Sequence, residues 1–367
     1  MQIKKVLFIG NTAWSMYNFR RSLFSELINQ NYRVFVVSPQ DNYYQEKLNE
    51  LGCCCITLDI SSKGVNPVTD IKLFFDIRKV LKQTKPDFCF FYTIKPNIYG
   101  CLAANSLNIK HIAIITGLGY TFINHNLISL IAMRLYKYSL KSASKVWFLN
   151  SEDKEIFIQN KLVKESNTSI LKGEGIDLSH FTLSDLPLKT SFLLIARMLW
   201  DKGIGEFVEA AKILKNKYPD IEFNLLGFIG VDNPSAISQK QVDEWSSNNI
   251  INYLGSTTDV RPFIKGCSCL VLPSYREGIP ISLLEGAAMG RPIITTNAVG
   301  CKEAINHNIN GFLCKIKDAD DLANSMEKII KMSIEEKTQM GIAGRKKMEN
   351  EYDVRLIIKQ YIDTLNQ

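Results

Sequence analysis

The sequence predicts an α/β protein with two doubly wound, parallel-sheet domains and a cleft between them. Short apolar runs rich in Val, Ile and Phe alternate with helix-like stretches, and this alternation starts twice along the chain. Runs that are apolar on both faces and alternate with helices are typical of parallel strands covered on both sides. The length of 367 residues agrees with two domains.

The first set of candidate strands lies before residue 150. The strands are residues 6–10, 34–38, 54–58, 88–92, 112–116 and 146–149. Helix-like stretches between them include residues 18–29, 70–82 and 127–141. We assign residues 1–182 to a first Rossmann-like domain.

The second set follows a polar, proline-containing segment, FTLSDLPLKT at residues 181–190, which is interpreted as a linker. Its candidate strands are residues 192–196, 222–226, 251–254, 269–272 and 292–295, and its candidate helices are residues 206–217, 259–265 and 281–289. We assign residues 190–350 to a second Rossmann-like domain. The tail from residue 333 is predicted to be helical throughout, with residues 351–367 packing back towards the first domain.

Composition excludes several classes of protein. A net charge of +7 and a pI of about 8.8 permit an anionic partner but are weaker than in many nucleic-acid binders. No apolar run approaches the roughly 20 residues that span a bilayer, and the N-terminal VLFIG is too short for a signal peptide. Nine cysteines without C-x-x-C spacing indicate buried, reduced thiols in a reducing cytosol rather than a zinc site.

The segment YREGIPISLLEG, residues 275–286, follows a candidate strand and opens a candidate helix. Pro280 suits the first helical position, and the free amides near Ile281 and Ser282 favour a phosphate. Glu277 and Glu285 bracket this helix end, and ionised carboxylates accept hydrogen bonds from sugar or ribose hydroxyls. The alternative is a surface loop followed by a half-buried helix glutamate.

A second motif, ARMLWDKG at residues 196–203, follows the candidate strand 192–196. Arg197 and Lys202 lie five residues apart across a strand-to-helix turn, and two cations there can neutralise a diphosphate. Basic residues are common in such turns, so the motif gains weight from its place in the same domain as Glu277. Ligands in such sheets bind at the carboxyl ends of the strands, where both motifs lie.

Other catalytic motifs are missing from the sequence. The first turn, GNTAWS at residues 10–15, lacks the G-x-G-x-x-G spacing and disfavours a dehydrogenase. No G-x-x-x-x-G-K-[ST] loop and no G-x-S-x-G elbow occurs. Asp318 and Asp320 form a D-x-D at the start of a polar helix and are interpreted as helix-start charge rather than a metal site.

Together, the E-x7-E spacing of Glu277 and Glu285 and the upstream cations Arg197 and Lys202 resemble the retaining glycosyltransferases of family 4, which have the GT-B fold. The resemblance covers nearly the whole chain and is closest in IARMLWDKGIGEFVEAA, YLGSTTDVRPFIKGCSCLVLPSYREGIPISLLE and the opening SMYNFR. These stretches are similar to bacterial enzymes that add N-acetylgalactosamine or a related sugar to a polyprenyl-diphosphate-linked saccharide in O-antigen, capsule or N-glycan assembly.

The resemblance implies a retaining, metal-independent hexosyltransferase with a UDP-sugar as co-substrate, no cofactor and no nucleic-acid partner. It implies that Arg197 and Lys202 hold the diphosphate and stabilise the leaving group, that Glu277 contacts the donor sugar, and that Glu285 contacts the ribose. The implied substrate-binding set is completed by the turn amides, the uracil site and the first-domain turn: Gly278, Ile279, Pro280, Ile281, Ser282, Tyr253, Leu254, Asn11, Thr12 and Ala13.

The sequence departs from the family at two places. Many relatives have His-Gly or Asp-Gly where this chain has Thr116-Gly117, and glycines where it has Asn11-Thr12-Ala13. No catalytic base is therefore assigned, and a front-face mechanism needs none if the leaving phosphate accepts the proton. Two alternatives stay open: a UDP-N-acetylglucosamine 2-epimerase of the same fold, and a non-catalytic module that binds nucleotide-sugar or lipid.

A basic segment predicts membrane docking. Residues 88–151 contain no Asp or Glu but six Lys or Arg, and Arg134, Lys137 and Lys141 recur on one face of the apolar helix 127–141. Such a helix can lie in a membrane interface. We therefore expect a cytoplasmic protein, peripheral on the inner face of the plasma membrane. The alternative is a helix packed into the first domain with a solvated basic edge.

Overall fold

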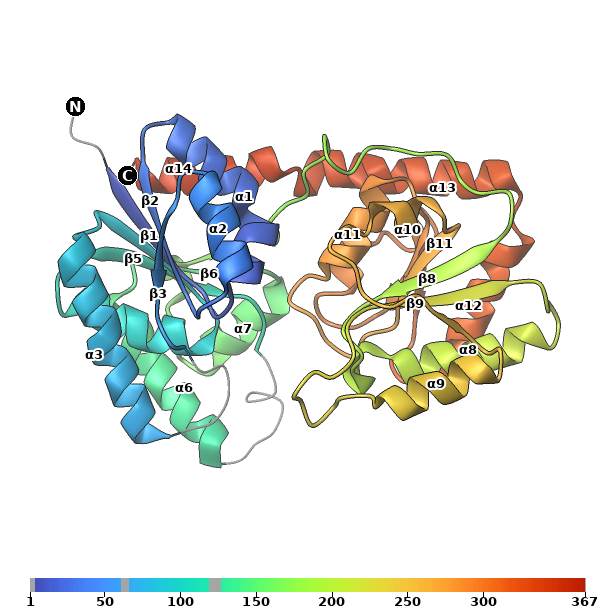
Figure 1. Ribbon diagram of the computed structural model, residues 1–367, viewed down its shortest axis with the longest axis horizontal. Coiled ribbons are helices and arrows are strands. Elements are labelled where there is room, and N and C mark those ends of the chain that lie inside the picture. Colours follow the sequence, from blue (N-terminus) through green and yellow to red (C-terminus); the bar gives the residue numbers. More distant parts are fainter. Residues whose placement is uncertain (1–3, 61–65, 119–126, 367) are drawn as a thin grey trace. The chain divides into compact units, whose positions relative to one another are not determined.

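The computed structural model describes residues 4–60, 66–118 and 127–366. The chain divides into two compact units, one formed by residues 1–175 and 354–367 and the other by residues 176–353 (Figure 1). The domain boundaries predicted from the sequence are residues 182, 190 and 350. Each unit has its own parallel sheet and its own core and is described separately.

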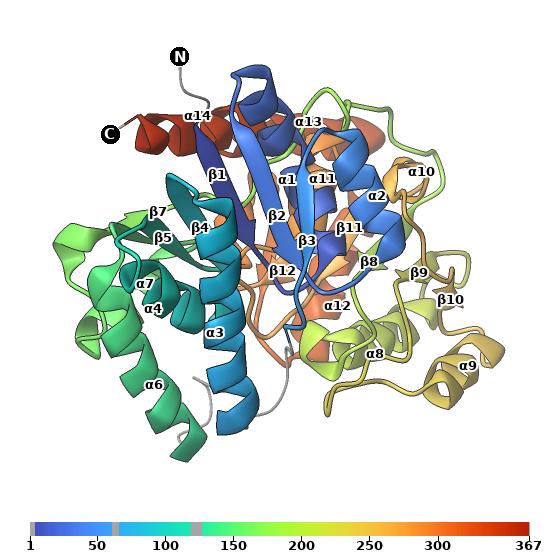
Figure 2. The ribbon, with the colours of Figure 1, turned by 60° about the vertical axis from the view of Figure 1, so that its left-hand side comes forward.

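The first unit contains a seven-stranded parallel sheet in the order β3-β2-β1-β4-β5-β6-β7 (Figure 2). The strands are β1 (Lys5–Ile9), β2 (Arg33–Ser38), β3 (Cys54–Thr57), β4 (Phe88–Tyr92), β5 (Lys110–Ile115), β6 (Lys145–Phe148) and β7 (Thr168–Ile170). All six predicted strands are present. The edge strand β7 was not predicted because it is only three residues long and two of them are polar.

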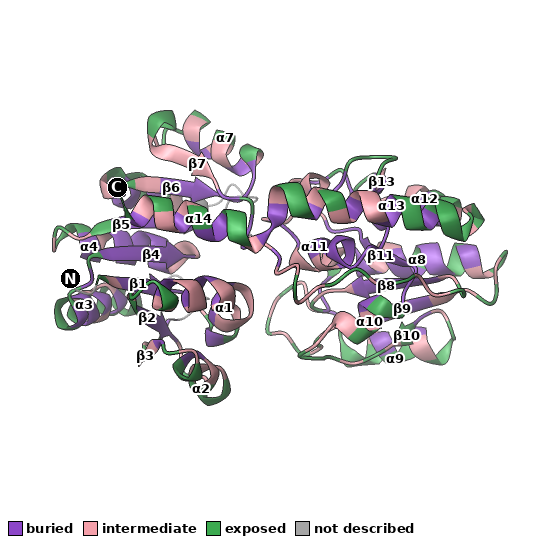
Figure 3. Ribbon diagram, turned by 90° about the horizontal axis from the view of Figure 1, so that it is seen from above, coloured by how far each residue is buried: buried purple, intermediate pink, exposed green. Residues whose placement is uncertain are grey.

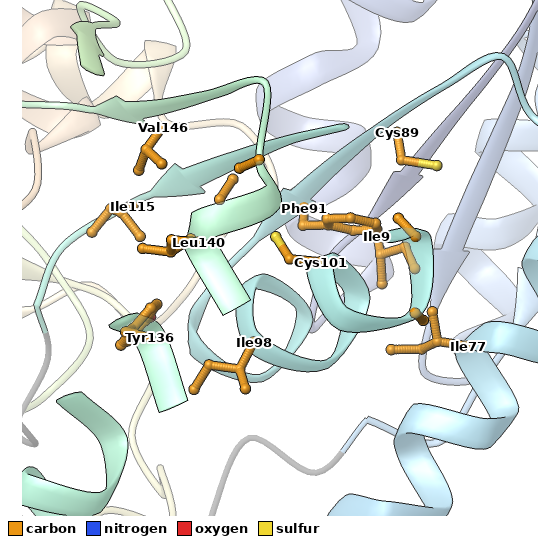
Figure 4. Close-up of a cluster of buried hydrophobic side chains, with 14 of the residues drawn as sticks. Ile9, Ile77, Cys89, Phe91, Ile98, Cys101, Ile115, Tyr136, Leu140 and Val146 are labelled. Carbon is orange, nitrogen blue, oxygen red and sulfur yellow. The ribbon is translucent and has the colours of Figure 1, made fainter. Parts of the chain in front are cut away.

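Helices cover both faces of this sheet. They are α1 (Ala13–Asn29), α2 (Asn42–Glu50), α3 (Pro67–Thr84), the π-helical turn η1 (Pro96–Gly100), α4 (Cys101–Asn105), α6 (Leu127–Ser139), α7 (Ser151–Gln159) and α14 (Val354–Leu365). One core lies between the sheet and the helices α3, α4 and α6, where Ile9, Phe91, Cys101, Ile115 and Tyr136 come together (Figure 4). These helices are therefore fixed to the sheet by continuous apolar packing.

The second unit contains a six-stranded parallel sheet in the order β10-β9-β8-β11-β12-β13. The strands are β8 (Ser191–Ile195), β9 (Glu222–Leu226), β10 (Asn252–Tyr253), β11 (Cys269–Leu272), β12 (Ile293–Thr296) and β13 (Gly311–Cys314). The five predicted strands are present. The edge strand β13 begins at a glycine, a residue depleted in strands, and was not predicted.

The helices of the second unit are α8 (Ile204–Lys215), α9 (Gln239–Ser247), α10 (Arg261–Lys265), α11 (Ile281–Ala288), α12 (Ala319–Lys331) and α13 (Ile334–Lys347). The strands are largely buried, whereas the outer surface of α13 is largely exposed (Figure 3). The predicted linker segment belongs to this unit. The fully buried guanidinium of Arg291 donates to the backbone oxygens of Ser184 and Asp185 and holds the segment in place.

The prediction of an uninterrupted helix after residue 333 is wrong. Helix α13 runs into a π-helical turn, η6 (Met348–Tyr352), and Asp353 then leaves the helical region, with φ −56° and ψ 128°. Helix α14 starts at the next residue and belongs to the first unit. The break therefore coincides with the point where the chain returns from the second unit to the first.

Two further findings concern the core and the membrane. All nine cysteines are free, and seven of them are buried, whereas Cys54 and Cys55 are half-buried. Within the described residues, no helix is both long enough and apolar enough to cross a bilayer.

Candidate active site

The two predicted motifs of the second unit meet at one point of its sheet. Strand β8 pairs with β9 on one side and with β11 on the other, so the direction of the strand order reverses between β8 and β11. Ligands in doubly wound sheets bind at such a reversal, beyond the carboxyl ends of the strands. Arg197 and Lys202 follow β8, and Glu277 follows β11. The strand order therefore places both motifs at the expected site.

The candidate anion-binding end of this site is the start of α11. Pro280 is the N-cap residue, with φ −79° and ψ 104°, so the helix begins at Ile281, one residue later than predicted. The first amides of any α-helix have no acceptor within the helix and carry partial positive charge. Glu285 lies in the second turn of α11 and is half-buried. The bracketing of a helix end by two carboxylates is thus present in the structure.

A buried ion pair joins the two motifs. Lys202 Nζ donates to Glu277 Oε1 at 2.5 Å. The side chains of Lys202 and Glu277 are only 14% and 15% exposed, so water screens the pair weakly. The sequence analysis gave these residues separate ligands, the diphosphate and the sugar. The structure brings them into direct contact. A ligand that binds one of these side chains therefore lies close to the other.

The loops that carry this pair are locked together by backbone contacts. The amide of Tyr275 and the hydroxyl of Ser274 donate to the carbonyl of Asp201 at 3.0 and 3.1 Å. Gly203 has φ +72°, and a Cβ atom there would lie 2.0 Å from the carbonyl oxygen of Pro273. Only glycine allows this approach, so it positions the Lys202 turn against the end of β11.

A second glycine supports Glu277 from the β12 side. Gly300 has φ +80°, and a Cβ atom there would lie 2.2 Å from the Glu277 carbonyl oxygen. The Glu277 amide donates to the Val299 carbonyl at 2.9 Å. Gly203 and Gly300 were not predicted as site residues, because their role depends on contacts with loops distant in the sequence. The only local signal was a glycine shortly after a predicted strand.

Cys301 lies buried beside this pair but does not supply a nucleophile. Burial, with a smaller contribution from the nearby Glu277 carboxylate, raises the pKa of the Cys301 thiol to about 12. The thiol is therefore protonated near neutral pH, whereas thiolate is the reactive form.

Arg197 differs from Lys202 in its surroundings. It is exposed and forms no ion pair with any residue that the structure describes. Its guanidinium is always charged and presents several donors in a planar fork suited to phosphate oxygens. The turn after β8 thus carries one cation neutralised by a carboxylate and another that is exposed to solvent.

Of the predicted uracil-site residues, Tyr253 lies on the edge strand β10 and Leu254 directly follows it. Tyr253 donates its hydroxyl to the Gly227 carbonyl at 2.8 Å, and the Leu254 amide donates to Leu225. Burial raises the pKa of the Tyr253 hydroxyl. Leu254 is 38% exposed and is the more accessible of the two. Tyr253 therefore holds the loop after β9, while Leu254 leaves apolar surface exposed.

The remaining predicted substrate residues belong to the first unit. Asn11, Thr12 and Ala13 follow β1, and the strand order of this sheet reverses between β1 and β4. Thr12 is the N-cap of α1, and its hydroxyl accepts a hydrogen bond from the Ser15 amide at 3.2 Å. Thr93, at the end of β4, has φ +69°, which is unusual for a β-branched residue. These turns lie at the corresponding carboxyl edge of the first sheet.

The acidic D-x-D serves a helix start, as predicted. The side chain of Asp318 is the N-cap of α12 and accepts from the Asp321 amide at 2.9 Å. Asp320 lies in the first turn of the same helix. Among the residues that the structure describes, no group of three or more His, Cys, Asp or Glu side chains is arranged to hold a metal ion.

Family models match both halves of the chain. Residues 5–150 match the model "Glycosyl transferase 4-like", and residues 187–347 match "Glycosyl transferases group 1". The chain is 34% identical to N,N'-diacetylbacillosaminyl-diphospho-undecaprenol alpha-1,3-N-acetylgalactosaminyltransferase of Campylobacter jejuni, over 98% of this chain and 97% of that protein. It is also 25% identical to UDP-Gal:alpha-D-GlcNAc-diphosphoundecaprenol alpha-1,3-galactosyltransferase of Escherichia coli, over 73% and 72% of the two chains.

Solved structures agree with this relationship at the level of the fold. A glycosyltransferase from Rickettsia africae superposes with a TM-score of 0.80 at 19% identity, covering 99% of this chain and 98% of the other. Anabaena Alr3699/HepE in complex with UDP and glucose gives a TM-score of 0.80 at 17% identity, covering 99% and 100%. The chain therefore belongs to the group 1 and 4-like glycosyltransferases and has the GT-B fold.

Proposed function

We propose that this glycosyltransferase moves a sugar from a UDP-sugar to a polyprenyl-diphosphate-linked saccharide during surface polysaccharide or glycan assembly. The preferred donor sugar is N-acetylgalactosamine, with another hexose or N-acetylhexosamine as the alternative. The proposal rests on the Lys202–Glu277 pair beside the start of α11, at the strand-order reversal of the second sheet. The Campylobacter jejuni relative, named for an undecaprenol-diphosphate acceptor, supports the choice of acceptor.

The donor would be bound by the second unit. The diphosphate is proposed to sit against the backbone N–H groups of Gly278, Ile279, Ile281 and Ser282, since Pro280 has none, where the partial positive charge of α11 favours an anion. Exposed Arg197 would reach the diphosphate from the turn after β8, and Lys202 would join it when the phosphate competes with Glu277. Glu285 would accept hydrogen bonds from the ribose hydroxyls, and Leu254 would cover the uracil.

The proposed reaction retains the configuration at the anomeric carbon. The bond between that carbon and the β-phosphate oxygen breaks, and the acceptor hydroxyl oxygen bonds to the carbon from the same face. The acceptor proton goes to an oxygen of the leaving UDP, so no protein base is required. Negative charge grows on the leaving phosphate, where Arg197, Lys202 and the α11 amides would stabilise it without a metal ion.

The first unit is proposed to face the acceptor and the membrane. Arg134, Lys137 and Lys141 are all exposed, as expected for a docking surface. Helix α6 also packs inward, because Tyr136 is buried and Met133 and Leu135 contact the core. Arg134 and Lys137 therefore lie on the exposed face of α6. Lys141 follows in the 3-10 turn η2 (Leu140–Ser142), because the helix ends at Ser139 rather than at residue 141 as predicted. Salt should weaken docking that depends on these cations.

Mass spectrometry of a polyprenyl-diphosphate disaccharide incubated with a panel of UDP-sugars tests the function. One UDP-sugar should add one sugar residue to the acceptor, and the variants Arg197→Ala and Glu277→Ala, which should form much less product, serve as controls. Conversion of a UDP-sugar to its epimer without acceptor would instead establish the epimerase. Binding of UDP-sugar without any product from any donor would contradict a transferase.

A further inference from the structure

Helix α3 presents a stripe of apolar side chains to solvent. Val68, Ile71 and Phe75 are 76%, 59% and 59% exposed, and their i, i+3, i+7 spacing puts them on one face of the helix. The opposite face, with Leu73 and Ile77, is buried in the core of the first unit. Single exposed apolar residues are ordinary, but three on one face of one helix usually mark a contact surface.

Helix α6 also exposes apolar side chains, in this case two consecutive residues. Leu130 and Ile131 are 52% and 42% exposed near the start of α6. Both helices pack on η1 and lie on the same side of the sheet (Figures 1 and 2). Figure 4 shows Ile77 of α3, Ile98 of η1 and Tyr136 of α6 in one cluster. The two exposed apolar groups therefore lie on helices that share one core and one neighbouring element, η1.

The two helices also start at the same edge of the sheet. Helix α3 connects the parallel strands β3 and β4, and α6 connects β5 and β6. A crossover helix between parallel strands starts beyond the carboxyl end of the first strand. The exposed apolar residues near the starts of α3 and α6 therefore flank the carboxyl edge that carries the β1/β4 reversal.

The exposed charges that accompany this surface are all positive. On α3 they are Lys72, Lys79 and Lys82, and on α6 from residue 130 onward they are Arg134 and Lys137. The half-buried charged residues of α3, Asp76 and Arg78, have opposite signs. Apart from Lys72, the exposed cations lie closer to the C-terminal end of each helix than the apolar residues do. If the apolar residues entered a bilayer, the cations would be left near the lipid phosphates. A second copy of the chain would bring the same cations against one another, so a symmetric dimer is disfavoured.

The start of α3 is held in place by polar contacts of Asp70. Asp70 is buried, with Oδ1 2.9 Å from Lys95 Nζ, and its Oδ2 accepts from the Tyr99 hydroxyl at 3.0 Å. Lys95 immediately precedes η1 and Tyr99 lies within it. Asp70 thus fixes the start of α3 to η1 from the side opposite the apolar stripe.

We propose that the starts of α3 and α6 form one membrane wedge, comprising Val68, Ile71, Phe75, Leu130 and Ile131. The wedge enters the headgroup–acyl boundary of an anionic bilayer, and the lysines and arginines further along the helices bind lipid phosphates. Docking in this orientation sets the carboxyl edge of the first sheet at the membrane surface. The inference rests on the proposed function for its purpose, because a polyprenyl-linked acceptor keeps its diphosphate at that surface.

Sedimentation with vesicles of equal parts phosphatidylglycerol and phosphatidylethanolamine tests the wedge. The triple variant Val68→Gln, Ile71→Gln, Phe75→Gln keeps every charge and changes only exposed side chains, so it should fold normally. Its vesicle partition coefficient should fall by at least about 10-fold, because apolar burial in the interface is lost. The matched control Leu188→Gln, Ile309→Gln, Leu356→Gln alters three exposed apolar residues elsewhere, at 96%, 58% and 46% exposure, and should bind like wild type.

Insertion itself is measured with Phe75→Trp and brominated phospholipids. The added tryptophan should be quenched relative to the wild-type background, whereas Ile213→Trp on α8 should add no quenched signal. Equal partitioning of wild type and the α3 triple variant, equal loss in the matched control, or no quenching at position 75 would overturn the wedge. So would a wild-type dimer that the triple variant converts to monomer.

Activity assays separate this inference from the proposed function. The α3 triple variant should transfer sugar normally to a short-chain, water-soluble polyprenyl-diphosphate acceptor and poorly to the same saccharide in vesicles. Equal activity of wild type and variant on the vesicle acceptor would overturn the wedge. Failure of wild type on both acceptors would contradict the proposed function, and the sedimentation and quenching results would still decide the wedge.

Discussion

Lys202 Nζ lies 2.5 Å from Glu277 Oε1, in a pair whose side chains are each about 15% exposed. Without donor, the cation proposed for the diphosphate is therefore already neutralised by the carboxylate proposed for the sugar. An incoming diphosphate would compete with Glu277 for Lys202. The Glu277 carboxylate could then accept hydrogen bonds from the sugar hydroxyls. Such an exchange would couple the two ends of the proposed donor site.

The assigned roles predict that two glutamate variants differ in their binding of UDP. Glu277→Ala should weaken binding of the UDP-sugar but leave UDP binding unchanged or tighter, because Lys202 is released. Glu285→Ala should weaken UDP and UDP-sugar alike, because the ribose is common to both. Calorimetric titration of each variant with both ligands checks this. A Glu277→Ala variant that lost affinity equally for UDP and UDP-sugar would contradict the assigned roles.

Lys202→Ala should cost both activity and stability. Removal of the ammonium group leaves the Glu277 carboxylate without its partner in a weakly hydrated position, which is unfavourable. The thermal midpoint should therefore fall, and the double variant Lys202→Ala, Glu277→Ala should recover part of the loss. Differential scanning calorimetry of the four proteins gives the coupling free energy. A coupling free energy of zero would show that the contact contributes nothing to folding.

Arg197→Ala should separate catalysis from stability. Arg197 is exposed and unpaired in the described structure, so its removal should not change the thermal midpoint. Turnover should fall on the order of 10²-fold, as for the loss of one donor to a developing oxyanion. Arg197→Lys should restore turnover only in part, since it lacks the bidentate fork. Near-wild-type turnover of Arg197→Ala would show that Arg197 does not bind the diphosphate.

The sequence predicted more of this molecule's strands than of its site contacts. Strands such as β4 and β8 are apolar on both faces and therefore visible without a structure, whereas the edge strands β7 and β13 are short or begin at glycine. The positions of Arg197 and Glu277 after strands of one sheet could be predicted. Their support could not, because the contacts of Gly203 with Pro273 and of Gly300 with Glu277 join distant loops.

The exposed face of α3 illustrates the same limit. The sequence of α3 has an ordinary amphipathic pattern. From this pattern it was predicted only to be a helix of the first domain. Which of its apolar residues face the core depends on how α3 packs on η1. The structure assigns Leu73 and Ile77 to the core and leaves Val68, Ile71 and Phe75 outside.

Metal chelation should leave the reaction intact. In the proposed site, positive charge at the diphosphate comes from Arg197, Lys202 and the amides at the start of α11. Turnover measured after dialysis against EDTA should therefore equal that of the untreated enzyme, and added Mg²⁺ or Mn²⁺ should give no more than a small change. Complete loss that either ion restores would show that the charge at the diphosphate is supplied by a metal.

Stability should fall in mild acid because of His111. Burial lowers the pKa of His111, whose Nδ1 lies 2.9 Å from the carbonyl oxygen of Ile109 within a mostly apolar site on β5. In the unfolded chain the imidazole titrates near its ordinary pKa of about 6.5. Above that pH the imidazole is neutral in both states and the full stability is present. As the pH falls below it, the unfolded chain binds a proton that the folded chain does not, so the free energy of unfolding decreases.

The slope from one such proton approaches about 1.4 kcal/mol per pH unit. Urea unfolding of wild type and His111→Gln between about pH 7.5 and pH 5 measures it. The glutamine can donate to the Ile109 carbonyl but does not titrate, so the variant should lose less stability than wild type over this range. His307→Gln, at an exposed position, is the matched control. Identical pH profiles for wild type and His111→Gln would show that the buried imidazole does not set the acid sensitivity of the fold.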